Sequence, residues 1–489
     1  MSEKIYLYEQ LTQYTATDAY PLHMPGHKRR SPEEMTGQKK VTGKTELPYD
    51  IDITEIDGFD NLHHAEGILL DAKKRLAALY DSEESFYLIN GSTGGILSAV
   101  SACTTMHGKI LMARNCHKAA YHAAQVRGLQ TVYLYPQIIE SAGVTLNGQV
   151  QAADVEAALE HDSQIQAVLI TSPSYDGVVS DVRAIADVTH RHGVPLIVDE
   201  AHGAHFGFHP YFPENSVKLG ADIVIHSLHK TLPAMTQTAA LHVNGTFVDR
   251  DKLREYLGIY QTSSPSYVLM AGIDRCVQVM TEYGRELMEA FANRLEKFRN
   301  SVSEFQYVRV LKFPGMYVDT SKILMAVPGK SGTWLAKRLR EEFHLEVEME
   351  TAEYALALTS VADTEEGFER LRKALQQIDQ ECVKEAGVMH IGAEKEQIQL
   401  KSVAKPFRQR MSIAEAKEAK GMSIALQDSV GYVSKEYVYL YPPGIPLVVP
   451  GEEISAELLG NLLEYRGQGM SLQGLKDYRA QWIEVCVGV

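Results

Sequence analysis

Short apolar runs alternate with amphipathic segments between about residues 85 and 242. The apolar runs are rich in Val, Ile and Leu, as expected for strands that are buried on both faces. They cover residues 86–89, 109–112, 131–135, 167–170, 196–198 and 223–225. Because helical patterns lie between several of them, the sequence predicts an α/β fold with a mainly parallel sheet covered by helices.

The pattern changes on either side of this region. The sequence of residues 1–45 indicates an N-terminal arm. A long helical pattern covers about residues 268–299, and the polar stretch 387–405 could be a linker. No internal repeat is evident. We therefore expect an N-terminal arm (1–45), a large domain (46–270), a small α+β domain (271–386) and a C-terminal domain (387–489).

Composition narrows the class of protein. The chain has 489 residues, 45% of them hydrophobic and 23% charged, which is typical of a globular protein with a large core. Its formal net charge of -15 argues against nucleic acid as a partner, because a phosphate backbone attracts a basic face. The negative charge would suit a cationic small molecule, but solubility explains it equally well.

Several features predict a cytoplasmic location. The five scattered cysteines form no CxxC pair and indicate reduced thiols. The first residues lack the plan of a signal peptide. No apolar run reaches the roughly 18 residues that a membrane-spanning helix needs, so we expect no membrane association.

The glycine-rich segment Gly91-Ser92-Thr93-Gly94-Gly95 follows a predicted strand and precedes a predicted helix. Glycines let a backbone approach an anion, and a helix N-terminus presents unpaired N–H groups, so a phosphate site is one interpretation. A tight turn with a Ser or Thr cap is an equally good one. The segment matches neither the Walker pattern nor GxGxxG, which argues against a nucleotide site.

A second motif, Asp199-Glu200-Ala201-His202-Gly203, follows the predicted strand 196–198. Ligands of α/β sheets bind at this end of the strands, and a carboxylate there can keep a pyridinium nitrogen protonated. A helix-capping aspartate is an equal alternative. The closeness of His202 and His205 in sequence suggests a metal site as another interpretation. Their spacing is not that of the HExxH motif, however, so we expect no metal.

The third motif, His226-Ser227-Leu228-His229-Lys230, again follows an apolar strand. An amine nucleophile needs a lowered pKa, which burial supplies. A surface lysine is the simpler interpretation of Lys230 taken alone. A phosphate cradle, an acid and a lysine on one edge of one sheet are, however, what pyridoxal phosphate needs, and neither a nucleotide enzyme nor a metalloenzyme needs all three.

The sequence resembles the ornithine/lysine/arginine decarboxylases, fold-type I pyridoxal-phosphate enzymes, in the short form without the N-terminal wing domain. The resemblance covers nearly the whole chain. It rests on Met24-Pro25-Gly26-His27-Lys28, Asp52-Ile53-Thr54-Glu55 with Gly58, Asp60 and Leu62, Asn90 to Gly95, Arg114 to Lys118, Ser172 to Gly177, Asp199 to Gly203, Ser227 to Lys230, Thr262 to Tyr267 and Tyr441 to Pro446.

The resemblance implies a role for each matching residue. Lys230 would carry the cofactor as a Schiff base, Asp199 would pair with the pyridine nitrogen, and His117 would stack on the ring, although a capping or core role for His117 is the alternative. The phosphate and the rest of the cofactor would contact Gly91, Ser92, Thr93, Ser174, His202, Ser227 and His229. Ser263 or Ser264 would reach the phosphate of a neighbouring subunit, which predicts at least a homodimer.

The activity implied by the resemblance is α-decarboxylation of a basic amino acid, with His229 or Lys230 protonating Cα. Arginine to agmatine is favoured over lysine or ornithine because short-form relatives often use arginine. His27 and the acidic residues Asp52, Glu55, Asp57 and Asp60 are candidates for the substrate side chain, with a solvated, capped loop as the even alternative. Another fold-type I activity, aminotransferase or lyase, would share Lys230 and Asp199, and a cofactor-free binding protein on the same scaffold is a further alternative.

Overall fold

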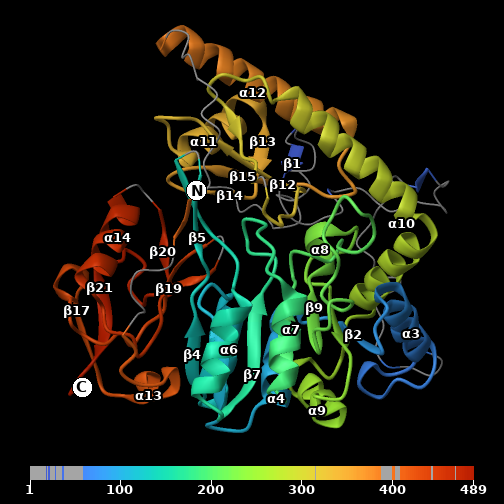
Figure 1. Cartoon of the computed structure of the whole chain (residues 1–489), viewed down its shortest axis with the longest axis vertical. Coiled ribbons are helices and arrows are strands. Elements are labelled where there is room, and N and C mark those ends of the chain that lie inside the picture. Colours follow the sequence, from blue (N-terminus) through green and yellow to red (C-terminus); the bar gives the residue numbers. More distant parts are fainter. Residues whose placement is uncertain are drawn as a thin grey trace, which may run out of the picture.

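The computed structural model describes residues 18, 20–22, 28, 36–37, 55, 59–141, 143–313, 315–386, 399–401, 408–441, 444–467 and 470–488. Its centre is a seven-stranded sheet in the order β2-β10-β9-β8-β7-β3-β4 (Figure 1). The strands are β2 (Glu84–Leu88), β3 (Lys109–Ala113), β4 (Gln130–Leu134), β7 (Ile165–Thr171), β8 (Leu196–Asp199), β9 (Ile223–His226) and β10 (Ala239–Val243).

All six predicted apolar runs lie in this sheet, and the predicted mainly parallel α/β fold is confirmed. Strands β3, β4, β7, β8 and β9 pair in parallel. The exception is β10, which runs antiparallel between β2 and β9, so that β2 points the same way as β9. The carboxyl ends of β2, β8 and β9 therefore meet at one edge of the sheet.

Helices cover both faces of the large sheet. Helices α6 (Ala152–His161) and α7 (Val182–Arg191) lie in front of it in Figure 1. Helix α4 (Gly91–Cys103) packs against β2 and β9, where a Cβ on Gly95 would lie 2.5 Å from Leu88 and 3.2 Å from Ile225. The remaining helices of this part are α3 (Ile68–Tyr80), α5 (Lys118–Arg127), α8 (Leu228–Thr231), α9 (Arg250–Tyr260) and the start of α10 (Tyr267–Ser301).

A smaller sheet forms the upper lobe in Figure 1. Its order is β11 (Arg309–Val310), β12 (Lys322–Ala326), β15 (Ala355–Leu358) and β14 (Met349–Glu350), with α11 (Gly332–Phe343) and α12 (Glu365–Ala386) against it. The long helix α10 runs from the large sheet into this lobe. A short strand of the predicted arm, β1 (Tyr20–Leu22), pairs in parallel with β13 (Leu345–Val347).

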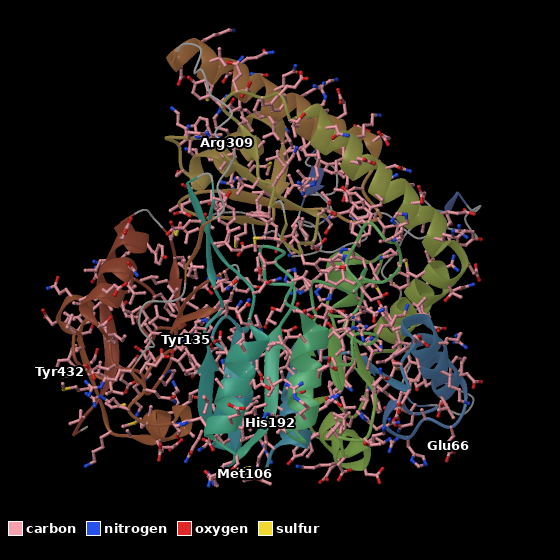
Figure 2. All side chains as sticks on the ribbon, viewed as in Figure 1. Glu66, Met106, Tyr135, His192, Arg309 and Tyr432 are labelled. Carbon is pink, nitrogen blue, oxygen red and sulfur yellow. The ribbon has the colours of Figure 1, made fainter. Side chains whose placement is uncertain are left out.

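The C-terminal residues form a third lobe, whose outer edge carries Tyr432 in Figure 2. It contains α13 (Ile413–Glu418), β17 (Gly421–Ala425), β18 (Val438–Leu440), β19 (Pro446–Val448), α14 (Ala456–Gly467), β20 (Leu472–Gln473) and β21 (Trp482–Cys486). The predicted linker is only partly described. Within it, β16 (Gln399–Lys401) pairs with β5 (Ile138–Ser141), which pairs with β6 (Val144–Asn147), so this part of the linker is a strand.

The described residues include no helix that is both long and apolar enough to cross a lipid bilayer. All five cysteines lie in the described part of the chain, and each is a free thiol. Four of them are buried, which is common for cysteine used as a small apolar side chain. The domain boundaries given above remain predictions.

Candidate active site

Three chain segments converge at the carboxyl edge of the large sheet. Asp199 is the last residue of β8, Lys230 lies on α8 just beyond β9, and Gly91 begins α4 just beyond β2. Parallel strands place these ends side by side, which is where open α/β sheets bind their ligands. The upper lobe faces this edge, since Lys322 of β12 contacts His202.

Helix α4 presents an N-terminus that could hold an anion. Its first residue, Gly91, has a φ of +69°, a conformation that favours glycine. The N-cap residue Asn90 uses its side chain to donate to Tyr260 O instead of capping the helix. Hydroxyl groups lie at the same end, because Ser227 Oγ donates to Ser92 Oγ at 2.9 Å. The predicted turn is thus the first turn of the helix, and Thr93 lies exposed within it.

The Lys230 amine is half-buried and has a lowered pKa. Burial is the main cause, and the negative charges of Asp199 and Glu348 oppose it. Its Nζ atom lies 2.9 Å from His202 Nε2. A lysine held in this way is more nucleophilic near neutral pH than an exposed one.

Asp199 is almost fully buried. Burial raises the pKa of its carboxyl group, while the nearby Lys230 cation lowers it. Its Oδ1 atom accepts one hydrogen bond, from the Ala201 N–H at 3.2 Å. A buried carboxylate at the end of a strand is stabilised by a cationic partner, which is what a protonated pyridine nitrogen would supply.

His117 occupies the N-cap position of α5. Its Nδ1 atom accepts from the Ala119 N–H at 3.2 Å, so the capping role considered for this residue is present. Burial, with a contribution from the Lys230 charge, lowers the pKa of His117 to about 3. The cap therefore holds a neutral imidazole in a fixed orientation close to Lys230, which is compatible with a ring-stacking role as well.

The other predicted cofactor residues border the same edge. The His229 Nδ1 atom lies 2.9 Å from Thr238 O, and because a carbonyl oxygen only accepts, this nitrogen is the donor. Ser174 is buried in the loop after β7, where its hydroxyl accepts from the Val178 N–H. In contrast, Ser263 and Ser264 are exposed on the loop between α9 and α10. That exposure leaves them available to another subunit.

The structure describes only two of the five residues predicted to read the substrate side chain, Glu55 and Asp60. His27, Asp52 and Asp57 lie outside the described residues. Asp60 is occupied at the start of α3, where its two carboxylate oxygens accept from four backbone N–H groups. Glu55 lies in the same area, since its charge reaches Tyr267, and its Oε1 atom is buried without a hydrogen-bond partner.

The structure also places residues at the site that sequence reasoning missed. Lys322 is buried and lies 3.0 Å from His202 Nδ1. Glu348 accepts from the Tyr175 hydroxyl, and its charge reaches both Lys230 and Lys322. Both come from the upper lobe, about 90 residues or more after Lys230 in sequence, and neither lies in a recognisable motif. Their place at the site can be recognised only from the three-dimensional structure.

The histidines considered for metal binding have different partners. His202 lies between two lysines, whereas His205 Nε2 contacts Asp319 at 3.2 Å. Among the described residues, no group of three His, Cys, Asp or Glu side chains is arranged to hold a metal ion.

Comparison with known proteins decides the family. The model of the Orn/Lys/Arg decarboxylase major domain matches residues 6–347, and the model of the C-terminal domain of Orn/Lys/Arg decarboxylases matches residues 395–468. The chain belongs to the ornithine/lysine/arginine decarboxylase family. It is an enzyme of the decarboxylase class with a fold-type I architecture.

Individual relatives agree with this assignment. An arginine decarboxylase of Bacillus subtilis (strain 168) is 28% identical over 487 residues, which is 98% of this chain and 97% of the relative. The structure of the Escherichia coli constitutive lysine decarboxylase has a TM-score of 0.73 at 18% identity, covering 98% of this chain and 83% of that one. An alanine–glyoxylate aminotransferase from Nostoc sp. shares the fold at a TM-score of 0.53 and 12% identity, over 65% of this chain and 88% of that one.

Proposed function

We propose that this decarboxylase uses pyridoxal 5'-phosphate to remove the α-carboxylate of arginine, giving agmatine. The observation that carries the proposal is Lys230 itself, a lysine of lowered pKa beside the buried Asp199 at the carboxyl edge of the sheet. A family match over most of the chain supports the reaction type.

The residues present fit this cofactor. The uncapped N-terminus of α4, with the hydroxyl groups of Ser92 and Ser227, would hold the phosphate. Lys230 Nζ would form the covalent link, and the Asp199 carboxylate would pair with the ring nitrogen. When bound, the cofactor supplies an electron sink for the bond that breaks at Cα.

The protein's own contribution is orientation and proton control. The imidazole of His117, held in place as the N-cap of α5, would face the ring, and His229 is oriented by its hydrogen bond to Thr238 O. After carbon dioxide leaves, Lys230 or His229 would deliver a proton to Cα. Because Nδ1 of His229 donates to Thr238 O, its Nε2 atom must first take up a proton before it can act as the donor. Burial of Asp199, His202 and Lys322 keeps water from competing with these groups.

A cavity of about 720 Å³ adjoins the site and would suit a cationic side chain. Glu348 and Tyr441 form part of its wall, and the other charged residues that line it are Glu350, Glu353, Glu464 and Arg340. We propose that Glu348 is the acid nearest the substrate head group, with Glu55 as a second candidate. Glu348→Gln should then raise KM for arginine more than it lowers kcat, and an unchanged KM would remove Glu348 from this role.

Arginine is placed ahead of lysine and ornithine because the Bacillus subtilis relative that covers nearly the whole chain is an arginine decarboxylase. Release of carbon dioxide from the three amino acids, measured side by side, tests this order. Conversion to a keto acid without gas would instead favour an aminotransferase, the fold of which this chain shares.

The cofactor has its own test. Purified protein should show the visible absorbance of covalently bound pyridoxal phosphate, and borohydride should abolish it by fixing the link. Lys230→Ala should lose both the absorbance and the decarboxylation, whereas Lys73→Ala, at a partly buried lysine of α3, should keep both. A Lys230→Ala protein that decarboxylates at the parent rate would refute the assignment, and so would a parent protein that takes up no cofactor.

The subunits should associate at least as homodimers, because Ser263 and Ser264 are exposed and would complete a neighbouring site. A cytoplasmic location is retained as a proposal, supported by the five free thiols.

A further inference from the structure

Three side chains, Lys230, His202 and Lys322, form a row at the centre of the site. Lys230 Nζ lies 2.9 Å from His202 Nε2, and His202 Nδ1 lies 3.0 Å from Lys322 Nζ. Lys322 is 1% exposed and also donates to Tyr175 O at 2.7 Å. The imidazole therefore connects an amine on α8, at the edge of the large sheet, with an amine on β12 of the smaller sheet.

Hydrogen-bond chemistry restricts the protons in this row. A protonated amine can only donate, and a neutral imidazole has one donor nitrogen and one acceptor nitrogen. Burial, together with the charges of Lys230 and Lys322, holds the pKa of His202 far below its ordinary value, so the ring is neutral. One lysine must then donate to His202 while the other accepts from it. The arrangement fits one protonated amine and one neutral amine.

The surroundings favour this single proton. Lys322 is approached by Asp319, Asp176 and Glu348, and Lys230 by Asp199 and Glu348, while His229 and His117 approach His202. The acids retain positive charge in the row. Burial and the mutual repulsion of the amines oppose a second proton, and burial in particular brings the pKa of Lys322 down to about 8.

We propose that Lys322 is a positioning residue that exchanges one proton with Lys230 through the His202 ring. In the first state Lys230 is protonated: its Nζ donates to His202 Nε2, and His202 Nδ1–H donates to a neutral Lys322. In the second state the Lys230 proton has passed to Nε2 and the Nδ1 proton has passed to Lys322, so Lys322 is protonated and Lys230 is neutral. Charge and atoms are the same in both states. No group outside the row needs to accept or supply a proton.

The exchange gives Lys230 what a cofactor lysine needs. An amine attacks a carbonyl carbon only when it is neutral, and Lys322 can hold the proton that Lys230 gives up. When Lys230 must act as an acid, the same proton can return. This use rests on the proposed function, whereas the proton exchange itself depends only on residues of the chain.

The reactivity of Lys230 towards acetic anhydride tests the proposal in the full chain after removal of any bound cofactor. Only a neutral amine reacts, so the labelling rate of the Lys230 peptide, followed by mass spectrometry from about pH 6 to pH 10, reports its protonation. Lys322→Met removes the partner that takes the proton. We expect its labelling rate near neutral pH to fall about tenfold, the equivalent of one pKa unit.

Lys322→Arg separates charge from packing. A guanidinium stays protonated, so it would donate to His202 Nδ1 at every pH and keep Lys230 as the neutral acceptor. The labelling rate should remain at or above the parent level and lose much of its pH dependence. A role in packing alone predicts the reverse, because Arg is bulkier than Met. Lys73→Met, on α3, is the matched control and should leave Lys230 labelling unchanged.

Two results would overturn the proposal, namely a parent-like pH profile in Lys322→Met or an equal fall in the Met and Arg variants. If Lys322→Met fails to fold, Lys322→Gln takes its place, because it also removes the amine that holds the proton. Its labelling should fall as in Lys322→Met, and an unchanged profile would again refute the proposal. Should the parent take up no cofactor while the Met and Arg variants still differ, only the proposed function would fail.

Discussion

Asp60 shows what a single carboxylate does at the start of α3. Its φ of +69° is a left-handed conformation that Asp and Asn tolerate better than most residues. Oδ1 accepts from the N–H groups of Asn61 and Glu66, and Oδ2 from those of Gly67 and Leu69. Burial raises the pKa of Asp60, but these donors outweigh it and lower the pKa to about 2. Asp60 therefore stabilises the turn that leads into α3, and this structural role is independent of any role of Glu55 in substrate binding.

The pKa of Asp60 leads to a prediction about acid stability. Because it is depressed from 3.8 in the folded state, its contribution is present above about pH 4 and is lost as the pH falls towards 2. Asp60→Asn keeps the left-handed conformation but only one acceptor oxygen. We expect a loss of about 1 kcal/mol at neutral pH, as for a helix cap, since solvent screens the larger value that the pKa alone suggests.

Urea unfolding as a function of pH would measure this effect. The difference between Asp60→Asn and the parent should shrink from about pH 4 downwards, and Asp71→Asn, at an exposed position in the first turn of the same helix, should show a smaller difference. Equal stabilities of Asp60→Asn and the parent at neutral pH would contradict the capping role.

At the scale of elements, α4 depends on a close approach to the sheet. A Cβ on Gly95 would come within 2.5 Å of Leu88 Cδ1, so Gly95→Ala must push the helix away from β2 or displace side chains. Overpacking of this kind costs about 1–3 kcal/mol. Since the same helix begins at the proposed phosphate site, the affinity for pyridoxal phosphate should fall as well.

Gly258→Ala in α9 is the control for this prediction. Nothing lies within 4 Å of a Cβ there, so alanine should stabilise the helix by about 0.5–1 kcal/mol. Thermal unfolding and cofactor titration of both variants would test the contrast. If Gly95→Ala melted at or above the parent temperature, the close contact would not be a constraint.

The elements also show how far the sequence alone could lead. Apolar runs such as those of β8 and β9 were recognisable because strands of a mainly parallel sheet are continuously buried. The motifs around Asp199 and Lys230 were recognisable because both residues follow such strands. Lys322 was not recognisable, because what marks it is its contact with His202, which lies in another part of the fold. A single lysine in an apolar strand belongs to no sequence motif. For β16, three paired residues lie inside a segment whose polarity indicated a linker.

At the scale of the whole molecule, a buried ion pair joins the C-terminal lobe to the large sheet. Arg114 Nη2 lies 3.0 Å from Glu452 Oε2, and Arg114 Nη1 donates to Pro446 O at 2.6 Å. Figure 2 marks Tyr135 close to the same junction. Burial raises the pKa of Glu452, and the Arg114 cation opposes the rise.

Arg114→Leu should therefore destabilise the protein strongly, by about 3–5 kcal/mol, because it leaves the Glu452 charge buried without its partner. The double variant Arg114→Leu/Glu452→Leu should recover part of the loss, since it removes the buried charge as well. Denaturant unfolding of the parent, both single variants and the double variant gives the coupling. A double variant less stable than Arg114→Leu by the full cost of Glu452→Leu would contradict this account.

Three large apolar side chains are exposed near the loop between α9 and α10. Phe59, Ile68 and Ile259 are 44%, 53% and 59% exposed. They lie near the loop that carries Ser263 and Ser264, because α9 contacts the 3-10 helix η2 (Leu62–His64) and His63 Nε2 lies 2.9 Å from Thr262 O. Exposed apolar side chains beside residues that would complete a neighbouring site fit an interface between two copies of the chain.

Ile68→Glu/Ile259→Glu should consequently shift the protein towards monomers, because it places two carboxylates in an apolar contact. Cofactor affinity should fall in parallel, since Ser263 and Ser264 could no longer reach a neighbouring phosphate. Tyr478→Glu changes a side chain that is 95% exposed in the C-terminal lobe and should alter neither property. Sedimentation velocity with cofactor titration separates the outcomes: a monomer that binds cofactor as tightly as the parent would show that each subunit completes its own site.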